Sequence, residues 1–103
     1  MVITELSANE LSKVIHAKQV SCREVMQAYL HRIESINPHF NALVSLQDPA
    51  RLLTQADAND AELSQGHSRG WMHGFPIALK DLVDVAGIAT TCGSPLLRDN
   101  IPR

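Results

Sequence analysis

The strongest signal in this chain lies in two blocks near its end, Gly74-Phe75-Pro76-Ile77-Ala78-Leu79-Lys80-Asp81 and Gly87-Ile88-Ala89-Thr90-Thr91-Cys92-Gly93-Ser94. In the first block, an apolar run follows a Gly and a Pro that suit a turn, and it leads directly into a lysine. A short apolar run bounded by turn residues predicts a buried strand over 76–79. The strand would carry the amine of Lys80 to a place where water is scarce, and an amine without solvation can act as a base near neutral pH. The first block therefore predicts a catalytic lysine at the end of a strand.

The charged residues of this region also have structural interpretations. A lysine after an apolar run is more often a surface residue than a catalytic one. Asp81 and Asp84 are typical turn formers, and Asp81 has a second possible role, which is to orient Lys80 or a backbone amide. The choice between these alternatives stays open on the residues alone.

The hydroxyl side chains of the second block predict hydrogen bonding within a loop rather than catalysis. Thr90, Thr91 and Ser94 lie next to Gly93. A serine nucleophile needs a base and an oxyanion hole within reach. Gly93-Ser94-Pro95 lacks the flanking glycines of a nucleophile elbow.

The first 66 residues predict three helices. Ser7 with Glu10, and Ser21 with Glu24, have the spacing of two capping boxes. The first helix should run to about Lys18. The second carries an apolar residue at every third or fourth position and should stop at Asn37-Pro38.

Two further segments complete this half of the chain. Residues 41–46 predict a short strand, with an extended linker as the alternative. Asp48-Pro49 should start the third helix, because Asp is a good cap and Pro suits the first turn. That helix should end near Gly66. In the C-terminal part of the chain, Val83-Asp84-Val85 predicts a second extended piece before the turn at Gly87.

Composition limits the class of protein. The 103 residues are 45% hydrophobic and 19% charged, with a net charge of −2, which is ordinary for a soluble globular protein. A chain of this length can bury roughly two-thirds of its surface. The chain lacks the stripe of basic residues that would predict nucleic-acid binding, and its apolar runs are too short for a membrane span. The N-terminus lacks the pattern of a signal peptide, and Cys22 and Cys92 predict two reduced, buried thiols in a cytosolic protein.

Cofactor signatures are missing from the sequence. None of the histidines has the spacing of a metal site, and structural roles are expected for all of them. The chain has no phosphate-binding loop and no dinucleotide fingerprint, so we expect no cofactor. The histidines are His16, His31, His39, His67 and His73.

The whole chain resembles the N-terminal portion of the amidase-signature hydrolases. The two blocks quoted above are the specific part of the likeness, and the capped helix pair from Ser7 to Ile36 and the segment Asn37-Pro38-His39-Phe40-Asn41-Ala42 accompany them in order. The resemblance implies an α/β fold with a mixed sheet between helical layers. The present chain would form one incomplete domain, helical over 1–66, with the start of the sheet and the lysine loop over 71–103.

The resemblance also implies a reaction. Amidases of this family hydrolyse a carbon–nitrogen amide bond through an acyl-serine, using a Ser–Ser–Lys triad and no cofactor. The triad lysine falls on Lys80, and Ile77 and Leu79 should keep its amine from water. No serine of this chain matches the two triad serines, so the 103 residues alone should be inactive.

Three functions remain open. Leu82 stands where the amidase subunits of tRNA-dependent amidotransferases usually carry asparagine, which favours a general amidase acting on a small-molecule amide. The amidotransferase subunit, working in a hetero-oligomer, is the first alternative. The second is a truncated, non-catalytic interaction module, whose unpaired strand edges would be covered by a partner subunit or by self-association.

Overall fold

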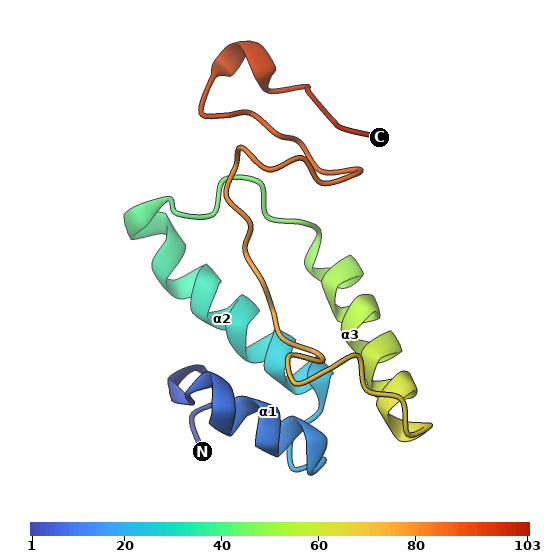
Figure 1. Cartoon of the computed structure of the whole chain (residues 1–103). Helices are drawn as coiled ribbons and strands as arrows, with labels where there is room; N and C mark the ends of the chain where they lie inside the picture. The colour runs from blue at the N-terminus through green and yellow to red at the C-terminus, as the bar shows by residue number, and fades with distance from the viewer.

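The computed structural model describes residues 1–103 and contains helices joined by long loops, with no strand. The three α-helices are α1 (Ala8–His16), α2 (Cys22–Phe40) and α3 (Pro49–Ser64). Two short 3-10 helices, η1 (Ile3–Glu5) and η2 (Pro95–Leu97), lie near the ends of the chain. Figure 1 shows the helices at one end of the molecule and the C-terminal loops at the other.

Both predicted capping boxes are confirmed. The Ser7 hydroxyl accepts the Glu10 amide and the Glu10 carboxylate accepts the Ser7 amide, each at 3.2 Å. Ser21 and Glu24 make the same reciprocal pair, each bond at 3.0 Å. Each box satisfies two N–H groups that a helix start leaves without a partner, which fixes where α1 and α2 begin.

Two helix ends differ from the prediction. α1 ends at His16 rather than Lys18, because Lys18 adopts a left-handed conformation with φ 59°. α2 continues past Pro38 to Phe40. A proline in the last turn removes only one helical hydrogen bond, and the Asn41 amide still bonds the Asn37 carbonyl at 2.6 Å. Asn41, at φ 50°, then ends the helix.

The third helix agrees with the sequence prediction. The Asp48 carboxylate accepts the Ala50 amide at 3.1 Å, and Pro49 occupies the first position of α3. The helix ends at Ser64, and Gly66 takes a left-handed conformation with φ 84°, as expected of a residue that terminates a helix.

The hydrophobic core is confined to the helical end. Only eight residues of 103 are buried, and the accessible surface of 7364 Å² exceeds the roughly 5,700 Å² typical of a compact protein of this mass. The predicted burial of two-thirds of the surface was therefore too high. The six buried apolar residues form one cluster: Leu11, Ile15, Val20, Cys22, Val25 and Ala56.

The predicted strands do not form. Residues 41–46 are an extended linker, the alternative given by the sequence, and residues 76–79 are extended without a partner. A strand needs a neighbour to accept its backbone hydrogen bonds, and these 103 residues provide none for 76–79. The turn at Gly87 contributes one isolated antiparallel bridge, between Val85 and Ile88. The mixed sheet that the resemblance implies is therefore not formed by these 103 residues, which consist of helices and loops.

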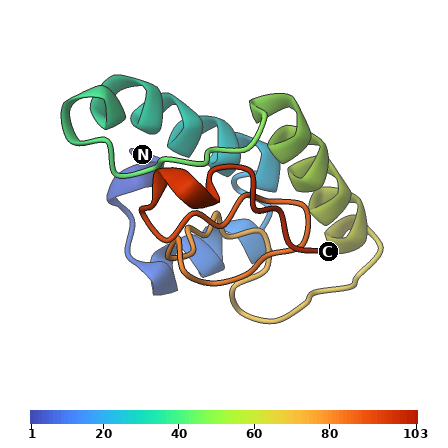
Figure 2. The ribbon, with the colours of Figure 1, turned by 90° about the horizontal axis from the view of Figure 1, so that it is seen from above.

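The C-terminal loops cover one end of the helices. The segment 76–80 runs from the 71–75 loop toward these loops, passing between α2 and α3 in the view of Figure 1. Viewed from above, residues 80–103 lie in front of α1, with α2 and α3 to either side (Figure 2). No helix combines the length and the apolar content that a membrane crossing requires.

One close approach connects the start of α2 to the segment that leads to Lys80. Gly74 has φ 79°, a conformation that residues with a side chain rarely adopt. A Cβ atom at this position would overlap the Cys22 Sγ and lie 3.2 Å from the Cys22 Cβ. Cys22 is fully buried and cannot move aside without disturbing the core.

We expect Gly74→Ala to lower the free energy of unfolding by about 2–4 kcal/mol, because backbone strain adds to overpacking against Cys22. Gly66→Ala is the matched control, since Gly66 has φ 84° with no atom within 4 Å of the added Cβ, and should cost about 1–2 kcal/mol. Urea denaturation of both variants measures the difference. Equal losses would show that Cys22 does not restrict this position.

Candidate functional site

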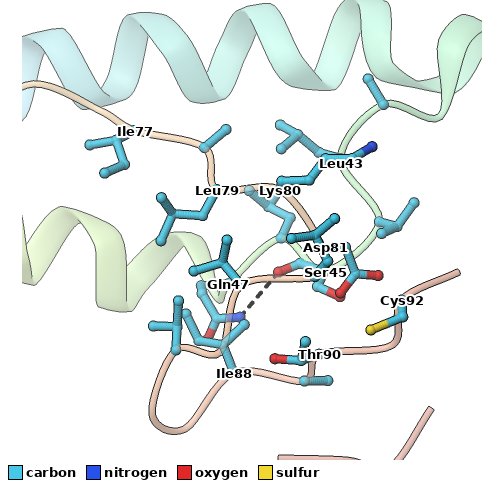
Figure 3. A pocket seen from close by; sticks show the side chains of 18 of the residues that line it. Leu43, Ser45, Gln47, Ile77, Leu79, Lys80, Asp81, Ile88, Thr90 and Cys92 are labelled. Carbon is cyan, nitrogen blue, oxygen red and sulfur yellow. Dashed lines mark hydrogen bonds between the residues drawn. The ribbon is translucent and has the colours of Figure 1, made fainter. Parts of the chain in front are cut away.

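An open cavity of about 590 Å³ lies between the linker after α2 and the loops after residue 76. Fourteen of its twenty lining residues are hydrophobic, and Lys80 and Asp81 are its charged members. Figure 3 shows the Lys80 side chain directed toward the linker, beside Leu43. The cavity brings together three segments that are far apart in the sequence, within residues 42–47, 77–83 and 88–93. The linker supplies Ala42, Leu43, Val44, Ser45, Leu46 and Gln47, and the other two segments include Ile77, Lys80, Thr90 and Cys92.

Lys80 is exposed in this chain, contrary to the buried position that the sequence predicted. Ile77 and Leu79 were expected to keep its amine from water, but they are 69% and 54% exposed. The reason is that no second layer packs on the extended segment 76–79. The Lys80 ammonium forms no ion pair.

The main chain beyond Lys80 is well ordered by hydrogen bonds. The Lys80 carbonyl accepts the amides of Leu82 at 2.8 Å and Val83 at 3.0 Å, which forms a tight turn. Before Lys80 the situation is the opposite, because the amides of residues 77–80 form no hydrogen bond within the chain. The position of Lys80 thus depends on the residues that come after it.

Asp81 confirms one of the two roles considered for it, the orientation of a backbone amide. Its carboxylate accepts the Thr91 amide at 2.8 Å and also the Thr91 hydroxyl. The Cys92 amide bonds the Asp81 main-chain carbonyl at 2.9 Å, and the Gly93 amide bonds the Thr91 hydroxyl oxygen at 3.3 Å. The Thr91 hydroxyl, and then the Thr91 amide, hold the pKa of Asp81 below its ordinary value, because both stabilise the charged form.

The loop opposite Lys80 has the structural role predicted for its hydroxyls. Thr90 is buried, and its amide and carbonyl pair with Asn100 at 2.9 and 3.0 Å. The Ser94 hydroxyl accepts the Leu96 amide at 3.3 Å and so caps η2. Cys92, at φ 52°, and Gly93, at φ 73°, form a turn in the chain. Cys22 is buried as predicted, whereas Cys92 is exposed, because it lies on this turn and outside the helical core.

The linker that forms the far wall is held from α2. The Asn37 side chain both accepts the Leu43 amide at 2.9 Å and donates to the Leu43 carbonyl at 3.0 Å. The side-chain amide nitrogen of Gln47, Nε2, donates to the Ser45 main-chain carbonyl at 3.1 Å (Figure 3). Asn37 was expected to stop the helix. Its side chain instead holds the linker that forms this wall of the cavity.

Two histidines have structural roles, as the sequence predicted. His73 is buried; its Nδ1 accepts the Arg69 amide at 3.1 Å and its Nε2 lies 2.9 Å from the Asn59 carbonyl. His16 lies 2.8 Å from both the Ser12 carbonyl and the Ser68 hydroxyl. No three His, Cys, Asp or Glu side chains gather as metal ligands.

Sequence reasoning missed the role of Asp60. Its two carboxylate oxygens accept the amides of Cys22 at 2.7 Å and Arg23 at 3.1 Å, so α3 caps the first turn of α2. Burial, together with the hydrogen bond and the charge of Asp60, raises the pKa of the Cys22 thiol to about 12. Asp60 is distant in sequence from the two amides that it accepts, so no local pattern could predict these hydrogen bonds.

The hydrogen bonds of Asp81 predict an acid-dependent loosening of the loop. Because the pKa of Asp81 is lowered on folding, its stabilising effect is complete above pH of about 4 and is lost as the pH falls through the lower folded value. The Thr91 amide resonance in an NMR titration should shift with a midpoint below pH of about 3.9. Asp81→Asn should abolish that shift. A midpoint at or above the ordinary value would contradict the hydrogen-bonded carboxylate.

Comparison with known proteins gives a consistent result. The family described as Amidase matches residues 24–103. Three relatives are each named as the A subunit of glutamyl-tRNA(Gln) amidotransferase. That of Bdellovibrio bacteriovorus is 34% identical over 102 residues, which is 99% of this chain and 20% of the relative. That of Acidothermus cellulolyticus is 42% identical over 96 residues, which is 93% of this chain and 19% of the relative. That of Thiobacillus denitrificans is 45% identical over 91 residues, which is 88% of this chain and 18% of the relative. The chain thus spans about a fifth of the length of these relatives.

Proposed function

The chain belongs to the amidase family, and on that premise we propose that it supplies Lys80 as the general base of a hydrolase that cleaves carbon–nitrogen amide bonds. The observation that carries the proposal is the position of Lys80, within the matched residues 24–103 and on the wall of the mainly apolar cavity of about 590 Å³. A single basic side chain on a mainly apolar cavity suits proton transfer to and from a bound substrate.

The proposed reaction follows the triad that the amidase resemblance implies. The neutral amine of Lys80 accepts a proton from a bridging serine, which takes one from a nucleophilic serine. The nucleophile attacks the amide carbonyl, the carbon–nitrogen bond breaks, and the amine leaves with a proton returned through the same relay. Water then hydrolyses the acyl-serine. Both serines belong to residues outside these 103, so this chain alone should form no acyl-enzyme.

The exposed surroundings of Lys80 set a requirement for this chemistry. A lysine acts as a base only as the neutral amine, which a dry environment favours. In a chain of the relatives' length, we propose that 76–79 pairs as a strand of the mixed sheet and that further residues cover Ile77 and Leu79. The free amides of residues 77–80 support this pairing, because they are available to a neighbouring strand. Residues 1–66 would then form the helical layer of the same domain.

A second candidate is the amidase subunit of a glutamyl-tRNA(Gln) amidotransferase. The names of the relatives favour it, whereas Leu82 favoured a general amidase on sequence grounds. Such a subunit would release ammonia from glutamine and work beside a partner subunit. We find no observation that favours the third possibility, a non-catalytic interaction module, over these two.

Partner binding and substrate choice separate the two amidase candidates. If the amidotransferase assignment is right, affinity purification of the full-length enzyme from its native host should retain a second subunit, and glutamine should be hydrolysed in preference to simple carboxamides. A lone chain that hydrolyses benzamide as fast as glutamine would identify a general amidase instead.

Lys80→Ala should lower kcat/KM for ammonia release by about 10²–10⁴-fold, the range that a general base typically contributes. The full-length enzyme in this test is a chain of the relatives' length in which residues 1–103 replace the matching segment of a relative. The folded fraction, measured by circular dichroism, should match that of the wild type, so that the loss of rate reports on the chemistry. Lys13→Ala, on the exposed face of α1, is the matched control and should stay active. Normal turnover by Lys80→Ala would end the proposal.

A further inference from the structure

Asp81 connects Lys80 to the opposite loop at three points. Its Oδ1 accepts the Thr91 amide at 2.8 Å, its Oδ2 accepts the Thr91 hydroxyl, and its main-chain carbonyl accepts the Cys92 amide at 2.9 Å. The Thr91 hydroxyl oxygen in turn accepts the Gly93 amide at 3.3 Å. One residue therefore fastens the 90–93 loop through both its side chain and its backbone.

These bonds restrain the main chain at Lys80, which the preceding segment leaves without hydrogen bonds. The four amides of residues 77–80 make no hydrogen bond, and the side chains of Ile77 and Leu79 are exposed. On the other side, Lys80 is joined directly to Asp81 and to the turn that its own carbonyl forms. Within these 103 residues the main chain at Lys80 is consequently restrained from the Asp81 side, and the strand pairing proposed for 76–79 would add a second restraint from the other side.

The loop held by Asp81 belongs to the same cavity as Lys80. Thr90, Cys92 and Gly93 line that cavity together with Lys80 (Figure 3). The bonds of Asp81 therefore hold the main chain at Lys80 relative to the 90–93 loop. A displacement of about 1 Å between reacting groups can cost about 10²-fold in rate.

We propose that Asp81 is a positioning residue for the proton transfer assigned to Lys80, and that it acts by clamping the 90–93 loop to the lysine through Thr91. This inference rests on the proposed function and deepens it. Asp81 is not itself a base for the reaction. Both of its carboxylate oxygens already accept hydrogen bonds, and these bonds favour the charged form over proton uptake.

The test compares single variants of the full-length enzyme with L-glutamine and benzamide as substrates. Asp81→Ala should lower kcat about 10²-fold while KM changes less than about threefold, because substrate binding remains and the alignment of the amine is lost. Asp81→Asn keeps one carbonyl acceptor and should restore part of the rate. Thr91→Val loses only the hydroxyl and should lower kcat about tenfold, with ammonia release as the readout.

The control is Asp60→Ala. Asp60 also accepts two backbone amides, at 2.7 and 3.1 Å, but it holds the start of α2 and not the cavity. Rates are divided by the folded fraction, measured by circular dichroism. Asp60→Ala should then keep the wild-type kcat per folded molecule. Equal kcat losses in Asp81→Ala and Asp60→Ala would overturn the proposal, because general destabilisation would explain both.

The remaining outcomes are distinguishable. If Lys80→Ala is inactive and Asp81→Ala keeps kcat within threefold of wild type, the positioning role is wrong and the proposed function survives. If Lys80→Ala is fully active, the proposed function fails and the positioning role fails with it. If Asp81→Ala does not fold, Asp81→Asn and Thr91→Val decide, and unchanged kcat in both would overturn the role of Asp81.

Discussion

The start of α2 is the point on which the rest of the structure depends. Its first amides are satisfied by Ser21, Glu24 and, from α3, the carboxylate of Asp60. The Cys22 thiol fills the space against Gly74, where no side chain fits. Three parts of the chain thus meet at one helix turn: α2, α3 and the loop that leads to Lys80. Because unsatisfied buried amides and overlapping atoms are both costly, this junction allows little variation.

From that junction outward the structure becomes progressively less buried. The core lies almost entirely on α1, α2 and α3, while residues 77–83 and 96–101 expose large apolar side chains. The C-terminal loops are ordered by hydrogen bonds instead, through Asp81, Thr91 and the pairing of Thr90 with Asn100. Hydrogen bonds to exposed groups add little net stability, so these loops define a geometry without an extensive core beneath them.

This division matches the family assignment. The family match covers the second and third helices and the cavity, yet the chain is about a fifth of the length of its relatives. The cavity of this chain carries one lysine, a linker wall and a loop held by Asp81. The base role proposed for Lys80 would need the two serines that the amidase resemblance implies, and no serine of this chain matches them.

Local rules determined the helices from sequence alone. The two capping boxes and Asp48-Pro49 each act within four residues, so their spacing was enough to place the helix starts. The lysine block could be recognised, but its burial could not, because the exposure of Ile77 and Leu79 depends on whether another layer packs there. The strand over 76–79 failed for the same reason, since pairing requires a partner distant in sequence. Only the tertiary structure brought Asp60 to α2, Thr91 to Asp81 and Asn37 to Leu43, because each of these contacts is set by chain geometry and not by the neighbouring residues.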